Sequence, residues 1–282
     1  YYQSILGSIS NTKGIKIENS SRCFFVKPIS LLVKNLSDID QIIKNKKSKI
    51  AIIGGGVASY ELAFSLLRRY EGNLEINILG KNILKEKNLN KKSKKYLKKI
   101  SNYLGIREIQ GEVVSISETH LTLKNGVIFE CDLSLVSSGA DIETWLSKSS
   151  LNKDKNGFIA VNDNLLSTND DNVFVTGDAC SVENNFRPKS GVMAVRQGEV
   201  LKENIFCKLT GRPLIKFRPQ NNWLYLVGTY KNYALLNYFF LSFHGRWCWK
   251  LKELIDKGFI NKFKFSSNIN MAKKNFELEK SK

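Results

Sequence analysis

The stretch IAIIGGGVASYE, residues 50–61, decides the fold of this chain. Its first four residues predict a buried strand, and the pattern after Gly56 predicts a helix. A glycine turn between a strand and a helix can hold a phosphate, because Gly54 allows the tight turn and Gly56 lets the backbone approach a pyrophosphate. The helix N-terminus adds unpaired N–H groups and a partial positive charge. We therefore expect a dinucleotide pyrophosphate to bind here.

The third small position of the dinucleotide fingerprint is Ser59, where glycine is usual. Serine still allows close helix–strand packing, so the match is weakened but kept. A tight turn without a ligand is the alternative. After the next expected strand come Gly80, Lys81 and Asn82, and none is the acid that usually binds a ribose 2′-hydroxyl. Lys81 would favour the 2′-phosphate of NADPH or serve as a solvated surface lysine, so NADH and NADPH both stay open.

The rest of the chain alternates strand and helix patterns, which predicts an α/β fold. We expect helices at 29–43, 81–100 and 191–209, and strands at 74–79, 131–137, 158–161 and 173–175. Alternating residues predict hairpin strands at 112–117, 120–123 and 127–129, with Asn125-Gly126 as the turn. Residues 211–282 differ in kind, because aromatic-rich strands precede an amphipathic basic helix at 246–257 and a polar tail from Ser266.

The composition limits the classes of function. The chain has 282 residues, of which 42% are hydrophobic, so disorder over its whole length is excluded. Its longest apolar runs are shorter than the ~20 residues that a membrane-spanning helix needs. The first residues lack the pattern of a secretory signal. The net charge of +18 comes with 35 Lys but only 9 Arg, and Arg is the residue suited to forked phosphate and base contacts. We expect no nucleic-acid partner.

The cysteines and histidines give no sign of a metal or redox centre. Five cysteines lie far apart in the sequence, at positions 23, 131, 180, 207 and 248. No pair has CxxC spacing, so we expect neither a zinc site nor a redox-active dithiol. Reduced, buried thiols in a cytoplasmic protein are the expected state. His120 and His244 have no partner nearby in the sequence, and a packing or turn role is expected for both.

The second motif is NVFVTGDA, residues 172–179, in which an apolar strand ends at Thr176-Gly177-Asp178. This resembles the flavoprotein signature in which the aspartate accepts a hydrogen bond from a ribityl hydroxyl. The helix opened by Gly191 would aim its N-terminus at the flavin pyrimidine edge, where negative charge develops on reduction. An Asx-type turn formed by Asp178 is the alternative.

The order of the motifs resembles the pyridine nucleotide-disulfide oxidoreductase superfamily. In that family a Rossmann-like NAD(P)-binding domain is inserted into an FAD-binding domain, and Gly7-Ser8 and Ser138-Gly139 are similar to its two interdomain crossings. The resemblance implies an α/β fold divided into the end of the FAD-binding domain with a linker (1–46), the NAD(P)-binding domain (47–135), the C-terminal part of the FAD-binding domain (136–210), and a small C-terminal α+β domain with a polar tail (211–282).

The resemblance can be narrowed. The family's redox cysteine pair is absent, as in the thiol-free branch similar to type II NADH dehydrogenases. FRPKSGVMAVRQG (186–198) and FHGRWCWKLKELID (243–256) are similar to the dehydrogenase-like region fused to selenide, water dikinase in some bacteria. The family begins with its own flavin-binding GxGxxG segment, and none precedes Gly7. We therefore expect that part to be missing and this chain alone to bind little FAD.

The resemblance implies an enzyme that passes a hydride from NAD(P)H to FAD and electrons onward to a small-molecule acceptor, in a context linked to selenide and selenophosphate. Gly54, Gly56 and Ser59 would hold the pyridine nucleotide, with Glu61 near the nicotinamide. The remaining candidates lie toward the flavin: Gly139, Gly177, Asp178, Lys189 and Gly191. No side chain is expected to act as a catalytic acid, base or nucleophile, because the cofactors carry the chemistry.

Two other interpretations stay open. The first is a non-catalytic nucleotide-binding or scaffold module that assists selenide, water dikinase. The second is a peripheral-membrane protein similar to NADH:quinone dehydrogenases, because residues 223–249 combine aromatics with lysines and those relatives anchor through C-terminal amphipathic helices. Packing of these aromatics inside the C-terminal domain is the interpretation we prefer over membrane contact.

Overall fold

The computed structural model describes residues 2–5, 7–18, 21–43, 47–71, 73–183, 189–219 and 224–263. Its centre is a parallel five-stranded sheet, here called the central sheet. The strand order across it is β4 (Cys23–Phe25), β11 (Leu133–Val136), β5 (Ser48–Ile53), β6 (Leu74–Gly80) and β7 (Arg107–Gln110). The inner strands are almost continuously buried, as expected for parallel strands covered on both faces.

Alternate residues of β5 contribute to two different cores. Ile50 and Ile52 pack against the helices on one face, which are α1 (Ile29–Lys34), α2 (Leu36–Ile43), α3 (Val57–Arg69) and α4 (Lys91–Tyr103). Ala51 and Ile53 pack on the other face against a small sheet of β10 (Ile128–Glu130), β9 (His120–Leu123), β8 (Val113–Ile116) and β3 (Lys16–Ile17). Because successive side chains of a strand point to opposite faces, the central sheet packs against helices on one face and the small sheet on the other, which makes a three-layer unit.

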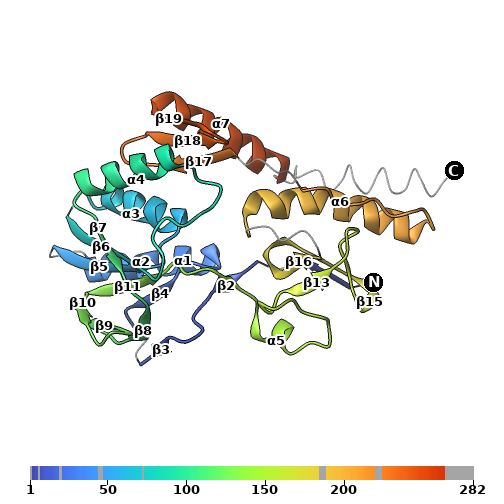
Figure 1. The fold of residues 1–282 in the computed structure, drawn as a ribbon, viewed down its shortest axis with the longest axis horizontal. Helices are drawn as coiled ribbons and strands as arrows, with labels where there is room; N and C mark the ends of the chain where they lie inside the picture. The colour runs from blue at the N-terminus through green and yellow to red at the C-terminus, as the bar shows by residue number, and fades with distance from the viewer. Residues whose placement is uncertain are drawn as a thin grey trace.

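A second five-stranded sheet, here called the outer sheet, lies beside this unit (Figure 1). Its order is β1 (Tyr2–Ile5), β15 (Asp170–Thr176), β14 (Leu166–Ser167), β13 (Ile159–Val161) and β16 (Cys180–Val182). The 3₁₀ turn η1 (Gly177–Ala179) and the helices α5 (Thr144–Ser147) and α6 (Gly191–Leu209) complete this part. Strand β1 pairs in parallel with β15, so the central unit is inserted between two neighbouring strands of the outer sheet.

The chain passes between the two sheets twice, and the two crossings pair with each other. Strand β2 (Ile9–Ser10) runs antiparallel to β12 (Ala140–Asp141). The predicted fold, a Rossmann-like unit inserted into a second α/β unit of the two-dinucleotide-domain type, is confirmed. The domain boundaries at 46, 135 and 210 stay a prediction.

The C-terminal part consists of three antiparallel strands and a helix: β17 (Leu224–Gly228), β18 (Ala234–Tyr238), β19 (Leu241–Gly245) and α7 (Arg246–Phe263). The strands pack on α3 and α4, at the top of Figure 1. Val227 and Leu235 join the core of the central unit. Among the described helices, none is long and apolar enough to cross a bilayer.

Two helix predictions need correction. The helix expected at 29–43 is divided at Asn35, whose N–H bonds to the carbonyl oxygens of Leu31 and Leu32 and ends α1. The helix expected at 81–100 begins only at Lys91, where the Asn90 side chain caps it by accepting a hydrogen bond from Ser93 N–H. Residues 81–90 form a loop instead. Leu84 and Leu89 of this loop are buried in the core of the central unit, and Leu84 N–H bonds to the Gly55 carbonyl rather than to a helical neighbour. The polar tail predicted from Ser266 lies outside the described residues.

Both histidine predictions are confirmed. The His120 ring bonds to Ser117 Oγ (2.8 Å) at the turn of the β8–β9 hairpin. His244 stacks on the rings of Tyr96 and Tyr233, and its Nε2 lies 3.0 Å from Thr229 Oγ1. Burial lowers the pKa of His244, which fits a packing role between the C-terminal sheet and α4.

Candidate functional site

A pocket of about 340 Å³ opens at the carboxyl edge of the central sheet. Ligands of open α/β sheets bind at this edge, because glycine-rich turns and helix N-termini gather there. The strand ends and both crossings supply the lining: Asn11, Lys13, Gly14, Ile15, Ile53, Gly54, Gly55, Leu79, Gly80, Lys81, Asn82, Gly111, Glu112, Val113, Ser138 and Gly139. The pocket thus contains the predicted residues Gly54 and Gly139.

Gly54 occupies a backbone position that only glycine fits. Its φ is +141°, and a Cβ there would lie 2.4 Å from the Ser137 carbonyl oxygen. Its N–H donates to the Leu79 carbonyl (2.7 Å), which joins the turn to the neighbouring strand β6. The turn therefore lies flat against both adjacent strands and leaves room above it at the sheet edge.

Gly56 and Ser59 shape the start of α3. Gly56 is the N-cap residue in an extended conformation, and the Ser59 N–H donates to its carbonyl oxygen (3.0 Å). Ser59 is fully buried, and its Oγ would be 3.0 Å from a Cβ on Gly54. A small side chain is thus required where the fingerprint usually has glycine. Ser59 Oγ has no hydrogen-bond partner among the described residues.

The loop 81–90 lies directly on this turn. A Cβ on Gly55 would lie only 1.9 Å from the Asn82 carbonyl oxygen, and the Leu84 N–H donates to the Gly55 carbonyl (2.8 Å). The Glu86 carboxylate accepts the N–H of Val57, the first residue of α3, at 2.8 Å. Sequence reasoning missed this contact, because the residues were expected to be helical.

An acid does lie at the tip of β6, although it belongs to another segment. Glu112 follows β7 and pairs with Lys81 (3.4 Å) and with Lys124 (3.4 Å). These two lysines, Lys124 first, lower the pKa of the Glu112 carboxyl. The strand tip therefore presents one carboxylate and two ammonium groups. Residues 80–82 contain only Lys81 as a charged residue, because Glu112 comes 31 residues later in the chain.

Glu61 faces away from the pocket, toward the C-terminal sheet. Its Oε1 accepts the Gly228 N–H at 2.7 Å, where α3 contacts β17. Burial raises the pKa of the Glu61 carboxyl, while the Gly228 N–H and the Lys252 charge act in the opposite direction. Of the predicted nucleotide-binding residues Gly54, Gly56, Ser59 and Glu61, only Gly54 lines the pocket. The placement of Glu61 near a nicotinamide stays a prediction.

The second predicted centre lies at the end of β15. Asp178 in η1 accepts a hydrogen bond from Ser8 Oγ (2.7 Å) and lies 3.6 Å from Lys27 Nζ. Gly177 has φ +73°, and its N–H donates to Gln197 Oε1 on α6 (2.7 Å). The turn is thus held between the first crossing and α6.

Lys189 and Gly191 lie where α6 begins. Lys189 Nζ donates to the Cys180 carbonyl oxygen and sits 4.0 Å from the centre of the Phe158 ring. Burial lowers the pKa of this ammonium group. Gly191 is the exposed first residue of α6, and Ser190 caps the helix. Burial raises the pKa of Cys180 to about 11, so its thiol stays protonated at neutral pH.

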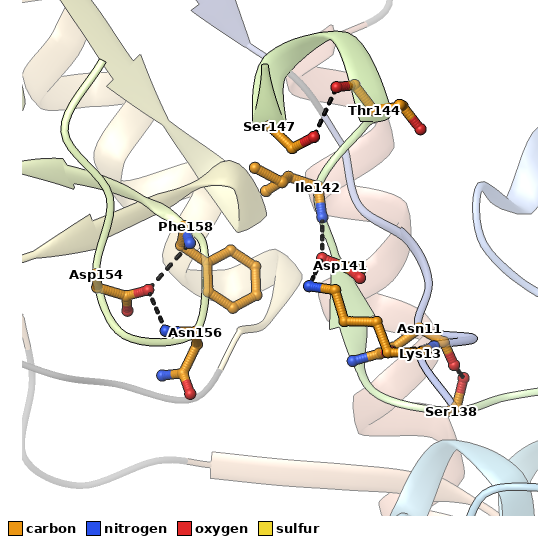
Figure 2. Close-up of polar contacts among 10 residues, drawn as sticks. All are labelled: Asn11, Lys13, Ser138, Asp141, Ile142, Thr144, Ser147, Asp154, Asn156 and Phe158. Atoms are coloured by element: carbon orange, nitrogen blue, oxygen red, sulfur yellow. Dashed lines mark hydrogen bonds and ion pairs between the residues drawn. The ribbon is translucent and has the colours of Figure 1, made fainter. Parts of the chain in front are cut away.

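Polar contacts hold the two crossings together. Figure 2 shows the Lys13 ammonium group paired with Asp141 (3.0 Å), and Ser138 Oγ donating to the Asn11 carbonyl oxygen (2.5 Å). Asp141 also accepts the N–H of Ile142 (2.9 Å). These contacts fix the pocket edge formed by Lys13 and Ser138 relative to the outer sheet. All five cysteines are free, and four of them are buried.

Among the described residues, no three or more His, Cys, Asp or Glu side chains lie close enough together to hold a metal ion. A comparison with curated proteins finds no match. The family model of pyridine nucleotide-disulphide oxidoreductases matches residues 17–198.

Three solved structures with the same fold illustrate the likeness. The water-forming NADH oxidase from Lactobacillus brevis, bound to NADH, has a TM-score of 0.64 at 19% identity, over 82% of this chain and 50% of that chain. An engineered water-forming NADPH oxidase derived from it, bound to NADPH, has a TM-score of 0.63 at 20% identity, again over 82% and 50%. The sulfide:quinone oxidoreductase from the hyperthermophilic bacterium Aquifex aeolicus has a TM-score of 0.69 at 14% identity, over 91% and 67%.

The chain spans about half the length of the two oxidases. At these identities the structural likeness shows the fold alone, and the family model carries the assignment. Because that model covers residues 17–198, well over half of the chain, the protein belongs to the pyridine nucleotide-disulphide oxidoreductase family.

Proposed function

We propose that this protein acts as an NAD(P)H-dependent flavin oxidoreductase, which passes a hydride from NAD(P)H to FAD and electrons onward to a small-molecule acceptor. The observation that carries the proposal is the glycine turn at Gly54–Gly56. A Cβ at Gly54 or Gly55 would collide with backbone, and the turn opens into a pocket at the carboxyl edge of a parallel sheet. This is the arrangement that dinucleotide pyrophosphates require.

Two groups of residues would bind NAD(P)H: the glycine turn with the start of α3, and the tip of β6. The main chain at Gly54 and Gly56 would hold the pyrophosphate, and Ser59 would keep α3 close to the strand. Glu112 and Lys81 at the tip of β6 lie where a ribose is expected, and they favour opposite cofactors. A carboxylate accepts a 2′-hydroxyl, while an ammonium group attracts a 2′-phosphate. Glu112→Gln is therefore expected to increase the affinity for NADPH relative to NADH.

FAD, when bound, would supply the hydride acceptor, and the protein would supply position and charge. The Asp178 carboxylate is 18% exposed and can accept a further hydrogen bond beside Ser8. The N–H groups at the start of α6, near Gly191, would face developing negative charge. Lys189, already half-buried, adds a positive charge on the same side. Gly139 and Gly177 would allow the chain to approach the cofactors at the crossing and at η1.

Nucleotide binding by the purified chain tests the proposal. NADH and NADPH are titrated calorimetrically into wild-type protein and into Gly56→Asp. Asp is a favoured N-cap residue, and Gly56 already has the extended conformation of a cap. The one close neighbour of a Cβ on Gly56 is the end of the Glu86 side chain (3.0 Å), which can move away, so the variant should fold. Its added carboxylate should weaken binding by at least about tenfold.

Gly258→Asp is the matched control, because it adds the same charge on α7 with no atom within 4 Å of the new Cβ. Equal affinities of the Gly56→Asp and Gly258→Asp variants would contradict the proposed site. Flavin absorbance of the purified chain is a separate measurement: little retained FAD is expected for this chain alone, and stoichiometric flavin would contradict that expectation.

The link to selenide, water dikinase is a finer part of the proposal. Its support is the similarity of residues 186–198 and 243–256 to the region fused to that enzyme. The expected partner is the dikinase itself, and the expected acceptor is a selenium or sulfur species. A cytoplasmic location belongs to the same proposal. Co-elution of the two purified proteins at micromolar concentration tests the association, and separate elution would contradict it.

A second candidate, contact with a membrane surface, is favoured by one observation. Several apolar side chains of the C-terminal part are exposed, including Phe239 (62%), Phe240 (72%) and Leu254 (70%). Among the aromatics of this part, Tyr225 and Tyr230 pack against the core of the central unit, whereas Phe239 and Phe240 are exposed. Co-sedimentation with anionic vesicles, lost in Phe239→Ser/Phe240→Ser, would support this candidate.

A further inference from the structure

The start of α3 is already occupied by a carboxylate of the chain itself. Glu86 Oε1 accepts the Val57 N–H at 2.8 Å, and a Cβ on Gly56 would lie 3.0 Å from the same oxygen. This contact is here called the Glu86 cap. The N–H groups of this first turn are the ones that a dinucleotide pyrophosphate would use. The Glu86 cap and a bound pyrophosphate therefore compete for the same donor.

The second oxygen of Glu86 indicates that the cap is not fully stabilised. Glu86 Oε2 is buried and has no hydrogen-bond partner among the described residues. A buried carboxylate oxygen without a partner is unfavourable, because its hydrogen bonds to water are lost and no hydrogen bond within the protein replaces them. The helix N-terminus partly offsets this through its positive end. The cap is thus a contact that a better-placed anion can replace.

The C-terminal sheet holds the loop that carries Glu86. Asn237 on β18 is fully buried, and its side chain donates to the Asn88 carbonyl oxygen (3.0 Å) and accepts the Asn90 N–H (3.0 Å). Ser242 Oγ donates to Asn90 Oδ1 (2.7 Å). The loop is therefore fixed on one side by the glycine turn and on the other by β18 and β19. Its position depends on how the C-terminal sheet packs.

We propose that Glu86 is an affinity-determining residue of the NAD(P)H site, which rests on the proposed function: its carboxylate occupies the Val57 N–H and must leave before the pyrophosphate can bind. Two carboxylate or phosphate charges cannot share one helix N-terminus without repulsion. Binding of NAD(P)H therefore displaces Glu86 and strains the contacts of Asn237 with the loop. The C-terminal sheet thereby influences the affinity for the nucleotide without touching it.

The test compares Glu86→Gln with wild-type protein. Glutamine keeps an oxygen that can accept the Val57 N–H, so the fold is retained while the negative charge is removed. Glu130→Gln is the matched control, because it removes an equal charge from the exposed strand β10 of the same unit. We expect Glu86→Gln to bind NADH and NADPH about tenfold more tightly, and Glu130→Gln to bind like the wild type.

A second readout does not depend on affinity. In a ¹⁵N spectrum, the Val57 amide signal should shift in Glu86→Ala without nucleotide, and NADH should shift it in the wild type. Equal NADH affinities for wild-type protein and Glu86→Gln, or weaker binding by the variant, would overturn this inference and leave the proposed function standing. No binding of NADH or NADPH by any of the proteins would overturn both.

Discussion

Two glycine turns at the predicted cofactor sites, at Gly54–Gly56 and at Gly177, are held in place by different kinds of contact. The first is fixed by main-chain fit: a Cβ on Gly54 would meet the Ser137 carbonyl at 2.4 Å, and the turn bonds to Leu79 through the backbone. The second is fixed by side chains, since Gln197 accepts the Gly177 N–H and Asp178 bonds to Ser8.

This difference indicates which substitutions each turn can tolerate. Rigid backbone neighbours cannot move away from an added methyl group, whereas side-chain contacts can rearrange. Substitutions of Gly54 or Gly55, which face backbone, should therefore damage the first turn, and polar truncations should damage the second. The following predictions test this comparison.

The largest effect is expected for Gly54→Ala. The new Cβ would collide with the Ser137 carbonyl, and alanine would have to adopt φ +141°. Together these should lower the free energy of unfolding by about 4 kcal/mol. Gly177→Ala, at φ +73°, should lower it by only about 1 kcal/mol. Urea denaturation, followed by tryptophan fluorescence, measures the free energy of unfolding of both variants. Equal decreases for Gly54→Ala and Gly177→Ala would contradict the difference between the two turns.

A smaller effect is expected for Asp178→Ala. This change removes the acceptor of the Ser8 hydroxyl and the partner of the Lys27 ammonium group. Loss of a part-buried, charge-assisted hydrogen bond should lower the free energy of unfolding by about 1–2 kcal/mol. Asp171→Ala, at an exposed position of β15, is the control and should be nearly neutral. A neutral Asp178→Ala would show that side chains do not hold the second turn.

The smallest effect is a pH dependence at Glu61, which connects α3 to the C-terminal sheet. Burial raises the pKa of this carboxyl above its value in the unfolded chain, so the folded protein binds the proton more tightly. Its contribution to stability is therefore fully present below the unfolded pKa and is lost as the pH rises through the raised folded pKa. Glu61→Gln keeps an acceptor for Gly228 N–H and should be more stable than the wild type near pH 8.

The measurement is the midpoint of thermal unfolding between pH 4 and pH 8. The Glu61→Gln curve should be flatter than that of wild-type protein, with Glu199→Gln on the exposed face of α6 as the control. Parallel curves for Glu61→Gln and wild-type protein would mean that the carboxyl does not titrate differently in the folded state.

Much of this architecture can be predicted from short stretches of sequence. The contacts between segments that are distant in the chain cannot be predicted in this way. The run IAIIGGG predicts a strand and a turn because strand, turn and helix are neighbours in the chain. Leu84 and Leu89 belong to a run, 81–100, whose apolar residues have roughly helical spacing, yet both are buried in a loop. The glycine turn packs against this loop, and a sequence pattern cannot reveal that surface. Glu86, Glu112 and Asn237 reach the site through pairings distant in sequence, and no local rule identifies such partners.

The pairing of β1 with β15 also bears on how the chain acquires its structure. The segments joined at Ser8 and Asp178 are 170 residues apart, and the entire central unit lies between them. Contacts of such long range form late, because a large loop must close before they can contribute. During synthesis, β1 therefore emerges long before β15, and the backbone groups that will pair with β15 are open meanwhile to association with other chains. The inserted unit, complete in its own sheet, can fold during that interval and bring the two crossings together.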